Sequence, residues 1–108
     1  MKASYDHEPL KLEPVGNGSF CFRWNIQQTT VEGNDIWTCD ETIAWKKTKD
    51  EITRCAIREI VTPDQEMKLI NDFNAANAEI LPASSKQPYL DYIAQRDILK
   101  ADIDNYFA

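Results

Sequence analysis

Histidine and cysteine are the side chains of this sequence best suited to nucleophilic or metal chemistry, and both are scarce. His7 is the only histidine and lies near the start of the chain, where segments are often loosely held. Cys21, Cys39 and Cys55 are widely spaced, whereas the ligands of structural zinc sites usually come in close pairs. We therefore expect no metal and no cofactor, and we interpret the cysteines as reduced core thiols, with Cys39 and Cys55 facing inward and Cys21 outward.

Neighbouring carboxylates are the other candidates for catalysis. Glycosidase-like chemistry needs two carboxyl groups across a cleft, one of them with a raised pKa, and no spacing here predicts such a cleft. Helix capping explains several of these acids without chemistry. Glycine-rich phosphate loops and the Gly-x-Ser-x-Gly motif are absent. We predict that the chain is not an enzyme. The acidic groups in question are Asp40-Glu41, Asp50-Glu51, Asp64 with Glu66, and Asp102 with Asp104.

Candidate binding residues are basic or apolar. Arg54 and Arg58 lie four residues apart on one face of a predicted helix, where they either pair with local acids or form a contact patch for an acidic partner. Leu90 and Ile98 fall outside the apolar stripe of another predicted helix. We expect a protein partner or a second copy to bury one of these two residues, or else the outer strand edge of residues 36–44. Arg96 lies inside that stripe and is expected to pair with an acid or to stack on an aromatic ring.

The elements that must position these residues follow from two periodicities. Between residues 9 and 45 apolar side chains alternate with polar ones, which predicts a three-stranded antiparallel meander. A three-residue loop at Gly16-Asn17-Gly18 sets Leu12 opposite Phe22, and a two-residue turn at Gly33-Asn34 sets Trp24 opposite Ile43. In this register the three tryptophans, Trp24, Trp37 and Trp45, all lie on the inner face, where we expect core packing rather than a carbohydrate platform.

Residues 48–107 change to helical spacing. Thr48 with Glu51, and Thr62 before a proline with Gln65, are helix-start signals. They predict helices over about 48–60 and 63–79, with a third from Pro88 to the C-terminus. We predict the α+β class, with three helices packed on one sheet face of a single domain, 1–108, whose residues 1–8 are loosely ordered.

Composition narrows the possible partners. The chain has 108 residues, 28% of them charged, and a formal charge of −6. This acidic balance opposes binding to nucleic acid. No apolar run reaches the length of a membrane span, and no leader segment is readable, so we expect a cytoplasmic location without a membrane partner.

One resemblance follows from the second half of the sequence. Ile52, Ala56-Ile57-Arg58, Val61-Thr62, Glu66, Leu69 to Asn74, Tyr89, Tyr92, Arg96 and Lys100 resemble a pattern in small uncharacterised proteins of prophages in gut bacteria, which are often encoded among tail genes. The resemblance implies a non-enzymatic accessory or structural interaction protein, with association to the phage particle as an alternative location. It transfers no catalytic residue. A small acidic regulatory or inhibitor-like protein that binds a host protein is the alternative function.

Overall fold

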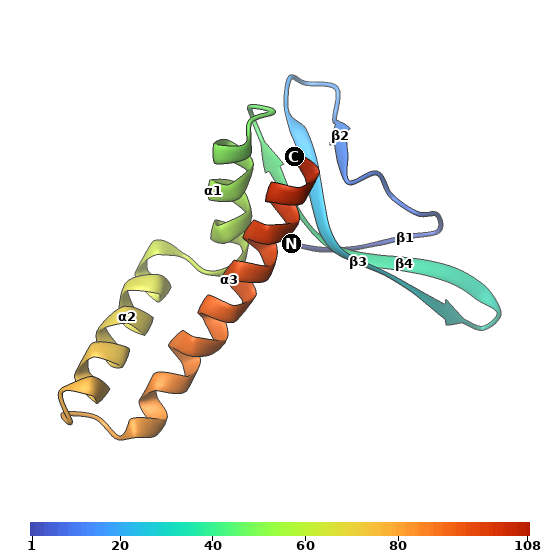
Figure 1. Ribbon diagram of the computed structural model, residues 1–108. Helices are drawn as coiled ribbons and strands as arrows, with labels where there is room; N and C mark the ends of the chain where they lie inside the picture. The colour runs from blue at the N-terminus through green and yellow to red at the C-terminus, as the bar shows by residue number, and fades with distance from the viewer.

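The computed structural model describes all residues from 1 to 108 and belongs to the α+β class. A four-stranded antiparallel sheet in the order β1-β4-β3-β2 is followed by three α-helices (Figure 1). The strands are β1 (Lys2–Tyr5), β2 (Leu12–Pro14), β3 (Phe20–Val31) and β4 (Asn34–Ala44). The helices are α1 (Lys49–Ile60), α2 (Pro63–Asn77) and α3 (Gln87–Tyr106), with a short 3₁₀ turn, η1 (Ala83–Lys86), before α3.

The prediction of three strands is wrong by one. Residues 2–5, expected within a loosely ordered segment, form β1 and pair with β4, so that Ala3 lies opposite Cys39. Strand β1 thereby covers part of the β4 edge, so the strand edge of residues 36–44, expected to be open for association, is already paired at residues 37–40. The segment lacks a strong alternating apolar pattern, and its order comes from this pairing, which sequence periodicity does not report.

The first hairpin has the predicted register, whereas the second does not. Leu12 pairs with Phe22 as expected, and Gly18 has the predicted positive φ of 87°. In the second hairpin the turn lies at Glu32-Gly33, where both residues have positive φ, as a type I′ turn requires. Compared with the predicted register, this turn shifts the β4 partner of each β3 residue by two positions. Because the shift is an even number, each side chain next to the turn stays on its predicted face of the sheet.

A bulge then moves the β3–β4 pairing by one further residue. The ladder is irregular between Trp24 and Gln27, where Asn25 has a φ of 54°. Trp24 therefore pairs with Asp40 rather than with Ile43. A shift of one residue reverses the faces of a strand, so Ile43 and the following Trp45 turn away from the core.

The helix starts are those predicted. The Thr48 side chain accepts a hydrogen bond from the Glu51 amide, and Thr62 forms a complete capping box with Gln65 in front of Pro63. Both devices satisfy amide groups that have no partner inside the helix. Helix α2 ends at Asn77, slightly before the predicted residue 79.

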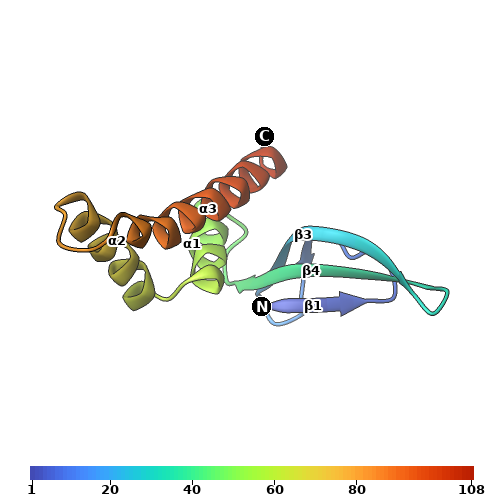
Figure 2. The same ribbon diagram turned by 90° about the horizontal axis from the view of Figure 1, so that it is seen from below.

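The core lies between the sheet and two of the helices. Phe22, Trp24 and Ala44 of the sheet form one buried cluster with residues of α1 and α3, namely Ile52, Ala56, Leu99 and Ile103. Helix α2 instead packs against η1 and α3, and it lies away from the sheet in both views (Figures 1 and 2). The expectation that all three helices cover one sheet face is therefore not confirmed.

We call the sheet, α1 and the C-terminal half of α3 the body of the molecule. We call α2, η1 and residues 87–97 of α3 the arm. The arm projects from the body as a helical hairpin (Figure 1). The radius of gyration is 16.8 Å, whereas a compact domain of this length has about 13 Å. The arm and the projecting β3–β4 hairpin account for this extension.

Candidate interaction surfaces

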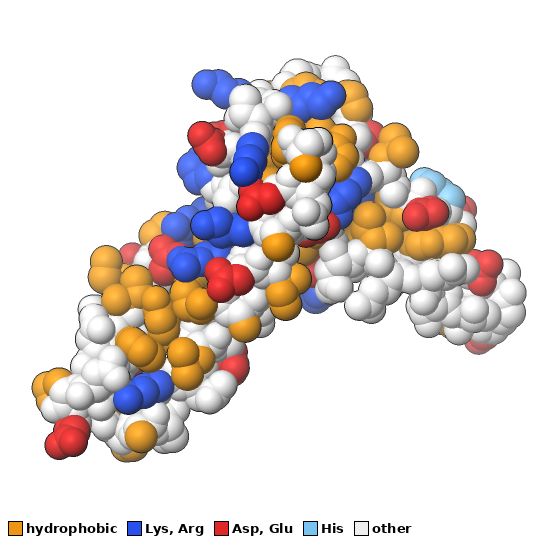
Figure 3. Space-filling model, in the orientation of Figure 1, with side chains coloured by type: hydrophobic (Ala, Val, Ile, Leu, Met, Phe, Trp, Pro, Cys, Tyr) orange, Lys and Arg blue, Asp and Glu red, His pale blue; other side chains and the backbone are white.

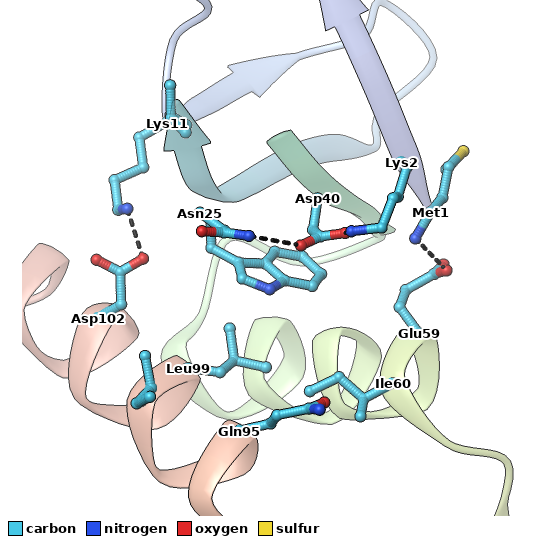
Figure 4. Close-up of a pocket in the computed structure, with 13 residues that line it drawn as sticks. Met1, Lys2, Lys11, Asn25, Asp40, Glu59, Ile60, Gln95, Leu99 and Asp102 are labelled. Carbon is cyan, nitrogen blue, oxygen red and sulfur yellow. Dashed lines mark hydrogen bonds and ion pairs between the residues drawn. The ribbon is translucent and has the colours of Figure 1, made fainter. Parts of the chain in front are cut away.

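A cleft of about 830 Å³ separates the sheet from α1 and α3. Its apolar lining comes mainly from Trp24, Ile60, Leu99 and Ile98, and Asn25 and Gln95 contribute side-chain amides (Figure 4). The Asn25 bulge helps to shape this cleft, because it interrupts the β3–β4 pairing next to the Trp24 indole.

Three ion pairs surround the cleft (Figure 4). The Met1 amino group lies 2.7 Å from Glu59, Lys2 lies 2.8 Å from Asp40, and Lys11 lies 2.6 Å from Asp102. The first and third pairs join the sheet half to α1 and α3. Each of these three carboxylates is therefore paired with a positively charged group of the same chain.

A second groove, of about 540 Å³, lies between α1 and α3 and is lined largely by charged residues. Arg54 and Arg58 both line it, together with Lys100. Arg54 contacts Glu51 at 2.5 Å, and Arg58 contacts Glu66 at 3.1 Å. Local ion pairing, one of the two interpretations of these arginines, is thus present.

The arm carries an apolar surface that the rest of the chain leaves partly open. Met67 and Ile70 lie three residues apart on α2, and Ile70 lies three residues before Phe73. The Phe73 ring lies 4.7 Å from that of Tyr89 on α3, and Ile93 follows one turn later. We call these five residues the arm face. Met67 is exposed and the other four are half-buried, and hydrophobic side chains gather over the arm in Figure 3.

A polar joint connects the arm to the body. Glu66 accepts hydrogen bonds from the hydroxyl of Tyr92 and from Arg58, so one carboxylate links α1, α2 and α3. The hydrogen bond from Tyr92 is the main reason why the pKa of Glu66 lies below its usual value. Arg96 stacks on the ring of Tyr92 at 5.6 Å, as the sequence predicted for an arginine in this stripe.

The sheet face that points away from the helices holds a buried charge cluster. Arg23 is 5% exposed and donates to Glu41 at 3.0 Å and to Glu13 at 2.9 Å. The Tyr5 hydroxyl donates to Glu41 at 2.6 Å. Burial alone would raise the pKa of Glu41, but the hydrogen bonds from Tyr5 and Arg23 outweigh burial and hold that pKa below its usual value.

This cluster ties together all four strands, since Tyr5 belongs to β1, Glu13 to β2, Arg23 to β3 and Glu41 to β4.

The cysteines nearby are buried rather than reactive. Cys21 lies 3.6 Å from Glu41, and burial raises the pKa of its thiol to about 11. Cys39 is buried too, on this outer face rather than in the predicted core.

Trp45 was predicted to lie in the core and is instead 64% exposed. Ile43, two residues earlier on the same strand face, is also exposed. Sequence reasoning missed this surface because the bulge at Asn25 changes the face that β4 presents. The one signal in the sequence was the asparagine at position 25, since asparagine tolerates the positive φ found there better than most residues.

The four predicted interaction residues do not form one surface. Arg54 and Arg58 line the groove between α1 and α3, Ile98 lines the cleft, and Leu90 lies on the arm outside both. Leu90 and Ile98 are exposed, the latter at 73%. All residues of the arm face except Met67 belong to the apolar stripes of the second and third predicted helices, which are expected to face inward.

The structure contains no group of three or more His, Cys, Asp or Glu side chains that could hold a metal ion. None of the helices combines the length and the apolar character that crossing a membrane requires. Comparison of the chain with protein-family models, with curated proteins and with solved structures finds no match.

Proposed function

We propose that this chain is a non-enzymatic interaction protein, and that it serves as a small accessory or structural component of a prophage tail region. The prophage setting rests on the resemblance of the helical half to such proteins. The interaction role rests on the arm face, an apolar surface on a projecting hairpin. Contiguous apolar surface of this kind on a folded protein is typical of sites that contact another macromolecule.

The polar groups of the molecule support binding rather than catalysis. The carboxylates around the cleft are paired with cations, and the Arg23 cluster is enclosed in the sheet. Catalytic acids and bases need access to a substrate and a pKa suited to proton transfer. The buried thiols of Cys21 and Cys39 have raised pKa values, which is the opposite of what a nucleophilic cysteine needs.

The test is the size of the protein in a native extract of cells that carry its gene. We expect the wild-type chain to elute well ahead of a monomer and the variant Ile93→Lys to elute later, because a charge on the arm face removes the contact. Ile98→Lys is the matched control, since it places the same charge on the same helix but outside the arm face. Elution of the wild type as a monomer would reject the proposed function.

A further inference from the structure

The chain exposes more surface than a folded monomer of its mass requires. Its accessible surface is 7086 Å², whereas a compact monomer of this mass has about 6,100 Å². The excess, on the order of 1,000 Å², is close to the roughly 800 Å² that each partner buries in a standard protein interface. The structure therefore carries about one interface's worth of uncovered area.

The arm is the part of this surface whose burial would contribute most to the free energy of association. The tip of the β3–β4 hairpin also projects, but it is formed largely by Gln, Thr, Asn and Glu, which suit water. The arm face consists of Met, Ile, Phe and Tyr side chains. Burial of apolar area contributes about 25 cal/mol per Å², so the driving force for association is concentrated on the arm.

The charges of the arm indicate what kind of partner fits. The five residues of the arm face carry no charge, and two ion pairs beside it are formed within the chain. Lys68 contacts Asp72 at 2.5 Å, and Arg58 contacts Glu66 at 3.1 Å. The arm face itself therefore offers a strongly basic or acidic partner no charge to bind, and its attraction for a partner comes from apolar contact. An apolar, uncharged face of the same dimensions is the complementary surface, and the arm itself supplies one.

The hairpin geometry favours the same partner. Two antiparallel helices bury only one side of each helix against one another, and two such hairpins placed face to face form a four-helix bundle with a shared apolar core. A two-fold axis brings the same patch of both copies together, so each Phe73 and Ile93 meets equivalent residues of the other copy.

We infer that the arm face is a homodimer interface, in which a second copy of this chain packs its own arm face against the first. This inference rests on the proposed function and names the partner. The two arms form a four-helix bundle, and the two bodies lie outside it with their clefts free.

The experiment is sedimentation equilibrium of the purified chain and three variants. We expect the wild type to change from monomer to dimer as concentration rises. We expect Ile70→Lys and Ile93→Lys to weaken dimerisation by about tenfold or more each, because each places a charge in the centre of the buried patch. Ile98→Lys should dimerise like the wild type. Far-ultraviolet circular dichroism establishes that each variant remains folded.

Two results would overturn the inference. One is a wild-type chain that stays monomeric at the highest concentration reached. The other is a dimer that Ile98→Lys disrupts while Ile70→Lys and Ile93→Lys do not, which would place the interface on the opposite face of α3. If the purified chain is a monomer but the native extract holds it in a larger complex that Ile93→Lys releases, the second-copy inference fails and the proposed function stands. A monomer in both settings rejects both.

Discussion

The body and the arm of this molecule bury their apolar residues to very different extents. In the body, Phe22, Ile52, Leu99 and Ile103 are almost completely buried between sheet and helices. In the arm, Ala76 of α2 and Tyr92 of α3 are buried, while the larger side chains of the arm face keep contact with solvent. The body is therefore closed by contacts within one chain, whereas, on the inference made above, a second copy completes the core of the arm.

The largest expected effect is a difference in stability loss between two matched substitutions, Phe22→Ala in the body and Phe73→Ala in the arm. Phe22→Ala should lower the free energy of unfolding by about 3–5 kcal/mol, because it leaves a cavity in the core. Phe73→Ala, measured at a concentration where the chain is a monomer, should cost no more than about 1 kcal/mol, since the site can relax into solvent. Urea denaturation measures both. Equal losses would show that the arm is packed as tightly as the body.

Glu41→Gln should remove a pH-dependent part of the stability of the body. The folded-state pKa of Glu41 lies below its usual value of 4.5. The stabilisation it contributes is therefore fully present above pH 4.5 and is lost as pH falls through the lower folded pKa. We expect the variant to be less stable by about 1–3 kcal/mol at neutral pH and to lose less stability on acidification below that range. Parallel stability profiles of wild type and variant against pH would contradict this role.

A smaller effect is expected at the start of the arm. Thr62→Ala removes a side-chain acceptor from the capping box of α2 and should cost about 1 kcal/mol of local stability. We expect the arm to open separately from the body, so the loss should appear as faster amide exchange within α2 alone. Thr48→Ala at the start of α1 is the control, and it should affect exchange across the body. Identical exchange patterns in the two variants would mean that arm and body unfold as one unit.

Addition of a metal chelator should have no effect on either region. The cysteines and His7 are not grouped as metal ligands, so we expect no part of the folding energy to depend on a metal. Thermal denaturation with and without chelator measures this. A large drop in the melting temperature would contradict it.

Local signals in the sequence predicted the helices well. Thr48, Thr62 and Pro63 act within a single helical turn, so the starts of α1 and α2 could be located from the chain alone. The first hairpin was also predictable, since Gly18 determines its loop.

Features that depend on contacts between distant segments were not predictable. The bulge at Asn25, where φ is positive, shifts the β3–β4 register by one residue and so reverses which β4 side chains face the core. Alternation of residue types cannot show where a strand gains such an extra residue. Strand β1 and the burial of Arg23 both depend on residues far away in sequence, Tyr5 and Glu41 among them. The partial burial of the arm face was not predictable for the same reason. Its helical stripe is typical of a core, and the sequence does not tell whether that core is completed within one chain or between two.

Hydrogen exchange of the purified wild-type chain at a low and a high concentration tests the account most directly, because it reports on arm and body in the same sample. We predict that amides in α2 and in residues 87–97 of α3 exchange more slowly in the concentrated sample, while those of β3, β4 and α1 do not change. Exchange in the arm that is independent of concentration, or protection that develops in the body instead, would contradict the claim that the arm face is where this protein assembles.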